Sequence, residues 1–387
     1  MNFEKIVGDG FYSEKENDLL AYSYDSLQLS EKPMGVIWPK DTEEVRRIIF
    51  FANQNNIPVI PRGNGTNNNG ATIYRQPSII IDFSSRMNHI IKINLNEKFV
   101  EVEPGVVVDD LNILLKQEGF IFPIIPKKSS VVTIGGMIAS NLISKNSLRY
   151  GNLNVWVSEI EFVDGTGKFF KSSDVDRFIG TEGCVVVFTK IRLKIKRIDN
   201  VKSYDIKSFD NLFELLRSLD LFKKDSEIEY LTFFDTQLSS FIGLKNYNLI
   251  IKYNSEKGFK KNFEEFVKID QYDRIAEKYI AHKNYLLKED VNIPENKIFD
   301  VINWAEINKV FVTGNILLGH LELFFDSEEK RHSFFTLVKH LNLKFYNGYG
   351  INKKMFVPNE LKIKMMRLKE EYDYNNILNR SKVIDYK

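Results

Sequence analysis

Glycine-rich segments are the part of this sequence best suited to chemistry. The first runs Gly63-Asn64-Gly65-Thr66-Asn67-Asn68-Asn69-Gly70. Glycines let a backbone approach a ligand closely, and consecutive N–H groups in such a turn form a concavity that binds anions. The Thr and Asn side chains add hydrogen-bond donors and acceptors. The loop therefore suits a pyrophosphate, although a long turn between two strands is the simpler interpretation of one such loop alone.

The spacing of these glycines excludes two common nucleotide motifs. G-x-G-x4-G is not the Rossmann fingerprint, and no G-x4-G-K-[ST] occurs in the chain. A second loop, PKKSSVVTIGGMIASN at Pro126–Asn141, and a GTEG at Gly180–Gly183 follow in the same half. Two glycine loops and a GTEG form a constellation that a purely structural interpretation does not predict.

Composition limits the class of protein. The chain has 387 residues, 43% of them hydrophobic and 27% charged, with a net charge of +2. That is a globular composition for about two domains, without the basic footprint of a nucleic-acid partner. Cys184 is the only cysteine, which excludes an intrachain disulfide and an iron–sulfur cluster. No apolar run is long enough to span a bilayer, and the N-terminus lacks the order of a signal peptide. We therefore expect a cytoplasmic chain, with peripheral membrane attachment through a partner left open.

Short α and β elements are predicted to position the glycine loops. Asp41 caps a helix whose Glu44 reaches back, and the helix has one apolar face. A second helix, Asp109–Glu118, turns Leu111, Leu114 and Leu115 inward before Gly119 ends it. The predicted strands of this half are 57–61, 78–83, 99–103, a hairpin of 158–163 with 168–170 turned by Asp164-Gly165, and one strand within 179–196.

The second half shows a different pattern. Helices are predicted at 209–221, 259–269, 327–341 and 359–372. Strands are predicted at 228–234, 249–253, 310–315 and 316–325. This order suits a mainly antiparallel sheet with helices on one face.

Five segments together carry a family resemblance. They are PRGNGT at 61–66, TIGGMIASN at 133–141 after a seven-residue step from Pro126, RYG at 149–151, FIGTEG at 178–183 and MMRLKEEYDYNNILNRSKV at 365–383. In order and spacing they resemble the vanillyl-alcohol oxidase (PCMH-type) flavoproteins, and within them the glycolate oxidase and D-lactate dehydrogenase group. The resemblance is strong over 25–198, moderate over the last forty residues, and architectural between them.

The resemblance implies an α+β fold. A PCMH-type FAD-binding domain of two α+β subdomains would span 1–197, and a reduced, ferredoxin-like antiparallel α+β substrate domain 198–345. A C-terminal segment, 346–387, would return to the flavin. The implied FAD-binding residues are Pro61, Arg62, Gly63, Asn64, Gly65, Thr66, Asn67, Gly70, Pro126, Ser129, Thr133, Ile134, Gly135, Gly136, Asn141, Gly151, Glu182, Gly183 and Val187. Related enzymes attach flavin to a histidine where this chain has Thr66, which implies non-covalent FAD.

Three departures affect the expected chemistry. The metal-using members carry GHxGDGNxH, whereas Thr313–Phe325 (TGNILLGHLELFF) holds one histidine, His320, so we expect no metal site. The histidine of the family's GEHGIG becomes Tyr349 within Asn347–Asn352, and a Gly of its GSEGTLG becomes Val186. These changes leave FAD binding intact and put the usual substrate chemistry in doubt.

Oxidation of a 2-hydroxy acid needs a base for the hydroxyl proton, and FAD to accept the hydride. Of His89, His282, His320, His332 and His340, the sequence favours His320, predicted to share a strand face with Leu318 and Glu322. A hydrogen-bonded histidine on a half-exposed sheet is the simpler alternative. Tyr349 would donate a hydrogen bond beside the flavin or only cover its ring.

Arg149 or Arg75 would pair with the substrate carboxylate, or simply lie at the surface. We therefore expect an FAD-dependent oxidase or dehydrogenase of D-lactate or glycolate type, passing electrons to a quinone, an acceptor protein or oxygen. The alternative is an FAD-bearing electron-transfer subunit of a glycolate-oxidase-like complex without substrate chemistry of its own. A nicotinamide-dependent reductase and a non-enzymatic binding protein rank lower.

Overall fold

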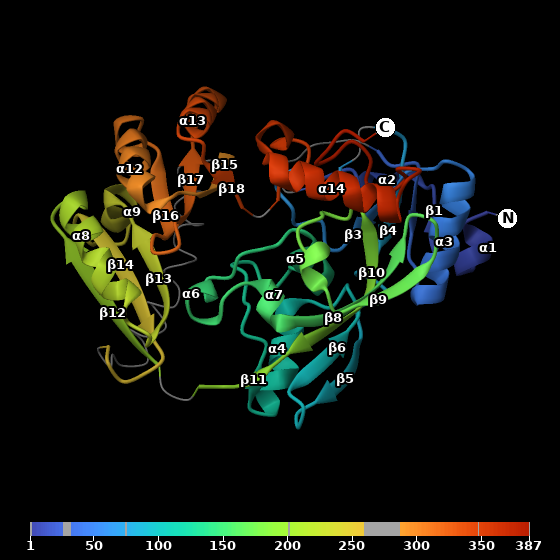
Figure 1. Ribbon diagram of the computed structural model, residues 1–387, viewed down its shortest axis with the longest axis horizontal. Helices are drawn as coiled ribbons and strands as arrows, with labels where there is room; N and C mark the ends of the chain where they lie inside the picture. Colours follow the sequence, from blue (N-terminus) through green and yellow to red (C-terminus); the bar gives the residue numbers. More distant parts are fainter. Residues whose placement is uncertain are drawn as a thin grey trace. The chain divides into compact units, whose positions relative to one another are not determined.

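The chain forms two compact units of mixed helix and strand. The computed structural model describes residues 2–25, 32–73, 76–199, 202–258, 287–346 and 348–386 (Figure 1). Unit 1 consists of residues 1–143, 152–198 and 347–387, and unit 2 of 144–151 and 199–346. The short segment that ends in Gly151 therefore belongs with the second half of the chain. The expected α+β class is confirmed.

The first sheet of unit 1 leads directly into the first glycine loop. Its strand order is β1-β2-β4-β3, with β2 and β3 both parallel to β4. Its strands are β1 (Tyr12–Ser13), β2 (Gly35–Ile37), β3 (Val59–Arg62) and β4 (Ile79–Asp82). Helix α3 (Thr42–Gln54) joins β2 to β3, a crossover that parallel strands require. Since β3 ends at Arg62, the sheet fixes the start of the loop.

The predicted cap of α3 is confirmed with one difference. The Glu44 N–H donates to Asp41 Oδ1 over 2.8 Å. The Glu44 carboxylate accepts from the Lys40 N–H, one residue before the cap, at 2.9 Å. The helix then buries its apolar face, formed by Val45, Ile48, Ile49 and Ala52.

The second sheet of unit 1 is antiparallel, with the order β5-β6-β10-β8-β9. Its strands are β5 (Ile90–Asn94), β6 (Phe99–Val102), β8 (Val157–Asp164), β9 (Phe169–Ser172) and β10 (Val186–Lys194). Strands β8 and β9 form the predicted hairpin. Two further short strands, β7 (Phe120–Ile121) and β11 (Lys196–Arg197), pair with each other.

The remaining elements of unit 1 are short, apart from two helices. They are α1 (Glu4–Val7), α2 (Glu16–Ala21), α4 (Val108–Gln117), α5 (Ile134–Ala139), α7 (Leu153–Trp156), η1 (Val175–Arg177), η3 (Lys354–Phe356) and α14 (Asn359–Tyr372). The expectation that Leu114 of α4 faces inward is wrong, because it is 44% exposed. The buried stripe follows Val108, Leu111 and Leu115, and Leu114 lies beyond its edge.

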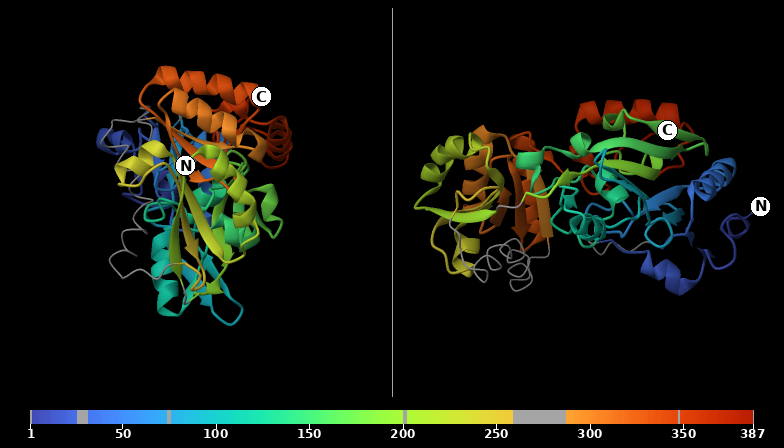
Figure 2. Two further views of the ribbon diagram at one scale, coloured as in Figure 1. Left: turned by 90° about the vertical axis from the view of Figure 1, so that its left-hand side faces the viewer. Right: turned by 90° about the horizontal axis from the view of Figure 1, so that it is seen from below.

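In its described residues, unit 2 is built on one seven-stranded antiparallel sheet. The strand order is β12-β14-β13-β16-β17-β15-β18. Its strands are β12 (Ser203–Phe209), β13 (Ile228–Phe234), β14 (Tyr247–Tyr253), β15 (Leu287–Asn292), β16 (Phe311–Asn315), β17 (His320–Phe325) and β18 (Lys344–Phe345). Its helices are α6 (Ser147–Tyr150), α8 (Leu212–Lys223), α9 (Thr236–Phe241), η2 (Glu295–Lys297), α12 (Ile298–Ile307) and α13 (Glu328–His340), and Figure 2 gives further views.

The expected ferredoxin-like topology is found in the second part of this sheet. The order along the chain is β15-α12-β16-β17-α13-β18, and in the sheet the four strands lie β18-β15-β17-β16. This is the split βαβ arrangement, here extended by β12, β13 and β14. The helix predicted at 259–269 lies outside the described residues. In the part of the chain that is described, no helix is long and apolar enough to cross a bilayer.

Candidate functional site

Two glycine loops, far apart in sequence, touch each other in unit 1. The first glycine loop is Pro61–Gly70 and the second is Pro126–Asn141. The Asn64 amide donates to the carbonyl of Val131 over 3.0 Å. A side chain at Gly63 would collide with the hydroxyl of Thr133. The close approach thus requires glycine at position 63.

A third segment, Phe178–Gly183, completes the convergence and is called the GTEG loop here. The Glu182 N–H donates to the Ala139 carbonyl at 2.8 Å, and the Gly180 N–H to the Ile138 carbonyl at 3.1 Å. Gly183 has φ +68°, and a Cβ there would approach Pro61 to 2.6 Å. The structure therefore brings together all three segments that the sequence singled out.

Free backbone donors occur in the first glycine loop and not at the start of α5. Within the described residues, the N–H groups of Gly63, Asn64 and Gly65 make no hydrogen bond, and these residues are exposed or half-buried. The first N–H groups of α5 are already used, because Ile134 donates to Val106 and Gly135 to Pro104. A cradle of glycines with unused donors fits an anionic group such as a pyrophosphate. The first glycine loop would therefore supply the backbone contacts.

Arg62 places a buried positive charge under the same loop. Arg62 is 8% exposed, and its guanidinium donates to the carbonyls of Tyr22 and Tyr24. Burial lowers the pKa of this group from its usual value, and neighbouring Asp82 and Asp25 oppose the effect. A Cβ at Gly65 would collide with the guanidinium, so the loop wraps over it. The positive charge of Arg62 favours an anion bound above it, while the guanidinium keeps its hydrogen bonds to the two backbone carbonyls.

Glu182 holds the turn that carries Tyr349. Its buried carboxylate accepts from the N–H of Tyr349 at 2.6 Å and from that of Gly350 at 2.8 Å. Burial raises the pKa of this carboxyl group, against those two hydrogen bonds and nearby lysines. On the other side of the turn, the side-chain amide of Asn69 donates to the Gly348 carbonyl at 2.9 Å. Tyr349 is thereby fixed to the first glycine loop and to the GTEG loop.

His320 lies in unit 2, at the start of β17. It pairs across the sheet with Asn315 on one side and Asn292 on the other. Its Nδ1 is buried and has no hydrogen-bond partner among the described residues. Burial lowers its pKa to about 4, so the imidazole is neutral at physiological pH. A neutral imidazole with an unused ring nitrogen is chemically able to accept a proton.

The surroundings of His320 correct one expectation. Glu322 lies two residues along the same strand face and is buried, where it binds Lys288 at 3.1 Å. Leu318 does not share this face, because it precedes the strand in a turn where its N–H donates to Asn315 Oδ1. Among the described residues, no group of three or more His, Cys, Asp or Glu side chains is arranged to hold a metal ion.

Comparison with known proteins identifies the part of the chain that contains the glycine loops. Residues 33–173 match the family model described as an FAD binding domain. The chain carries an FAD-binding domain. The family resemblance of the sequence motifs is thus confirmed, and FAD is its cofactor.

Curated relatives of this FAD-binding chain are hydroxy-acid enzymes by name. The glycolate oxidase subunit GlcD of Bacillus subtilis is 27% identical over 220 residues, which is 54% of this chain and 47% of that protein. D-2-hydroxyglutarate dehydrogenase of Haemophilus influenzae is 33% identical over 162 residues, 41% of this chain and 16% of the other. D-lactate dehydrogenase [cytochrome] 1 of Saccharomyces cerevisiae is 26% identical over 219 residues, 52% of this chain and 37% of the relative. The chain spans less than half the length of each of these relatives.

Solved structures confirm the fold over nearly the whole chain. An alkyldihydroxyacetonephosphate synthase superposes with a TM-score of 0.74, covering 96% of this chain and 83% of that one. The two sequences are 15% identical, so this likeness shows the PCMH-type fold alone.

The remaining predicted FAD-binding residues lie in several settings. Pro126 is buried, the Ser129 carbonyl accepts from the Asp109 N–H, and Asn141 is exposed with φ +49°. Val187 lies in the hydrophobic core of unit 1, so its side chain is not available to a ligand there. Gly151 lies in unit 2 and is not among the converging segments.

The other candidates for chemistry have ordinary roles or lie outside the described residues. Arg149 donates to the Ser226 carbonyl within unit 2 at 2.7 Å. His89 pairs with Glu103 at an exposed site, and His332 bonds its own helix. His340 is exposed at the end of α13. Arg75 and His282 lie outside the described part of the chain.

Sequence reasoning missed the residues that hold the end of the first glycine loop. The Gly70 N–H donates to Asp25 at 2.9 Å, and the Lys382 ammonium donates to the Gly70 carbonyl at 3.0 Å. Asn379 donates to the carbonyl of Ala71, the residue after the loop. Lys382 and Asn379 belong to the C-terminal motif, whose resemblance to the family was the only available signal.

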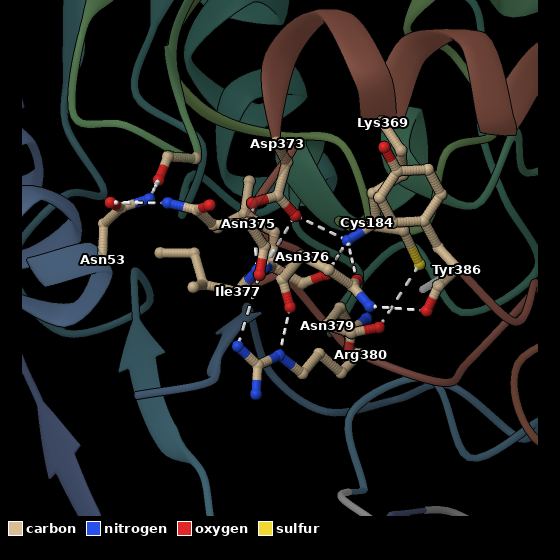
Figure 3. Close-up of polar contacts among 12 residues, drawn as sticks. Asn53, Cys184, Lys369, Asp373, Asn375, Asn376, Ile377, Asn379, Arg380 and Tyr386 are labelled. Carbon is tan, nitrogen blue, oxygen red and sulfur yellow. Dashed lines mark hydrogen bonds and ion pairs between the residues drawn. The ribbon is translucent and has the colours of Figure 1, made fainter. Parts of the chain in front are cut away.

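The C-terminal segment that carries these residues is anchored by a buried lysine. The Lys369 ammonium donates to Asp373 at 2.5 Å, to the Asn376 side chain at 2.7 Å and to the Leu378 carbonyl at 2.7 Å (Figure 3). The Asp373 carboxylate also accepts the N–H groups of Ile377 and Leu378. Burial raises the pKa of Asp373, and Lys369 opposes that shift. All three ammonium protons are thus used inside the protein, which buried charges need.

Proposed function

We propose that this chain is an FAD-dependent oxidoreductase that oxidises a small 2-hydroxy acid of the D-lactate or glycolate type. The names of its curated relatives support that substrate class. The observation that carries the proposal is the convergence of three glycine-bearing segments around the unused N–H groups of Gly63 to Gly65.

The first glycine loop would hold the FAD pyrophosphate through those N–H groups, with Arg62 beneath. The second glycine loop and the GTEG loop would line the isoalloxazine and adenosine ends. Thr66 has no ring nitrogen to attach a flavin, which favours non-covalent FAD. When bound, FAD supplies the hydride acceptor of the reaction.

His320 is our candidate for the base that takes the proton from the substrate hydroxyl. It is neutral, and its Nδ1 has no partner in the described residues. Tyr349 is our candidate for a hydrogen-bond donor at the flavin. Burial and Glu182 raise its pKa to about 12, so it keeps its proton at neutral pH. We assign no arginine as the partner of the substrate carboxylate. We also propose a cytoplasmic location, with membrane attachment only through a partner.

A second candidate function is an FAD-bearing electron-transfer subunit of a glycolate-oxidase-like complex. The observation that favours it is the single histidine of Thr313–Phe325, together with the fact that the Bacillus subtilis relative is named as a subunit of glycolate oxidase. In that case His320 would be a structural residue and the substrate chemistry would belong to another chain.

Anaerobic absorbance spectroscopy distinguishes the two. The FAD-loaded chain would be mixed with D-lactate, glycolate or D-2-hydroxyglutarate, and the visible flavin band followed over time. We expect one of these acids to bleach the band. A chain that no hydroxy acid bleaches, but that dithionite reduces, contradicts the oxidoreductase proposal and supports the electron-transfer subunit.

A further inference from the structure

One buried residue of the C-terminal segment contacts the chain on both sides of the first glycine loop, with its backbone N–H before the loop and its side chain after it. The Asn379 N–H donates to the carbonyl of Val59, in the strand that enters the loop, at 2.8 Å. Its side-chain amide donates to the carbonyl of Ala71, just after the loop, at 3.0 Å. The same amide donates to the Glu182 carbonyl in the GTEG loop at 2.8 Å. Asn379 is 2% exposed, so these hydrogen bonds are shielded from water.

The position of Asn379 is itself fixed by its neighbours. The Val59 N–H donates to the Ile377 carbonyl at 2.8 Å, so the segment runs alongside β3 as an added parallel bridge. On its other side the Lys369–Asp373 pair holds Leu378 (Figure 3). Asn379 also has φ +44°, a conformation that asparagine and glycine tolerate and most residues do not. A buried ion pair and a backbone conformation with positive φ thus hold the side-chain amide of Asn379 in one orientation.

We propose that Asn379 is a positioning residue for cofactor binding, which sets the separation of the two ends of the first glycine loop and ties them to the GTEG loop. A loop whose ends are fixed loses less conformational entropy when a ligand orders it. The unused N–H groups of Gly63 to Gly65 would then point at the ligand before it arrives. The inference rests on the proposed placement of FAD at this loop and goes beyond it by assigning a residue that need not touch the cofactor.

The test compares two asparagine-to-glycine variants of the full chain. N379G removes the amide, keeps the N–H to Val59 and suits the positive φ. N375G is the matched control, because the Asn375 amide, four residues earlier, contacts Asn53 and not the loops. The FAD dissociation constant is measured by titration. Hydrogen–deuterium exchange of residues 61–73 is measured with and without FAD.

In the wild-type chain, FAD is expected to slow exchange over 61–73. If FAD binds without protecting this segment, the placement of FAD fails, whatever the variants do. N379G is expected to weaken FAD binding roughly tenfold or more, the size of one or two lost buried hydrogen bonds, and to speed exchange of the loop in the absence of FAD. N375G is expected to change neither.

A protected wild-type loop with N379G binding FAD within twofold of wild type would overturn the role of Asn379 alone. If N379G does not fold, N379D replaces it, because aspartate has the same size and tolerates the same φ. Its ionised carboxylate cannot donate to the two carbonyls, whereas its protonated form donates to one. As pH falls, FAD binding by N379D is then expected to strengthen relative to wild type. A ratio of the two FAD dissociation constants that does not change with pH would contradict the proposal.

Discussion

At the residue scale, two glycines and one buried carboxylate hold the converging segments in contact. Gly63 and Gly183 are required by close approaches to Thr133 and Pro61, whereas the sequence indicated glycines for a close approach to a ligand. The family resemblance implied that Glu182 binds FAD, whereas its carboxylate accepts the N–H groups of Tyr349 and Gly350. Those partners lie about 170 residues away along the chain, which local pattern cannot detect.

The pKa of His320 gives a prediction at the same scale. Burial lowers this pKa to about 4, so the imidazole is in its base form above that pH and loses this role only as pH falls through it. The rate constant for bleaching by the hydroxy acid is therefore expected to stay level from about pH 8 to pH 5.5. An unperturbed histidine would already lose activity near pH 6.5. H320N is expected to slow the reaction by a factor of about 100 or more, the usual contribution of a general base.

Stopped-flow traces of flavin bleaching across this pH range measure both effects. H332N, which changes the exposed histidine of α13, is the matched control and is expected to behave as wild type. A full rate in H320N, or a decline centred near pH 6.5 in the wild-type chain, would remove His320 from the mechanism.

At the element scale, the helices and the hairpin that are marked by local sequence signals were predicted correctly. The Asp41 cap, the Asp164-Gly165 hairpin and helix α14 are found where the sequence placed them. Strands β12 and β15 were missed. Each is paired with a strand distant in sequence, and β15 mixes Lys, Glu and Asp with apolar residues, so neither shows a clear alternation.

The anchoring of α14 to the C-terminal segment gives a prediction for stability. K369M leaves the Asp373 carboxylate buried without its ammonium partner, so we expect a loss of about 3 kcal/mol in unfolding free energy. The double variant K369M/D373N is expected to recover part of that loss, because the uncompensated charge is removed. Urea unfolding of the chain without FAD measures both. Equal stabilities for K369M and wild type would show that the pair does not anchor the helix.

At the scale of the whole molecule, the family resemblance predicted features of the fold that composition and hydrophobic periodicity could not predict. The order of strands and the return of the C-terminal segment to the first sheet depend on pairings between residues hundreds of positions apart, such as Val59 with Leu378. Composition and periodicity constrain neither of these. The ferredoxin-like part of unit 2 is larger than expected, because three more strands extend its sheet.

The central claim is that the three converging segments bind FAD, and a loop variant tests it directly. Gly136 lies at the start of α5, and a Cβ there would meet only the Thr133 hydroxyl, at 3.0 Å. G136E and G136Q add side chains of equal size, but only G136E adds a negative charge, next to Thr133, which lies against Gly63 of the first glycine loop. The measurement is the flavin retained per chain after incubation with FAD and gel filtration. We predict one FAD per wild-type chain and clearly less for G136E than for G136Q, whereas a colourless wild-type chain, or equal retention by both variants, would contradict this account of the site.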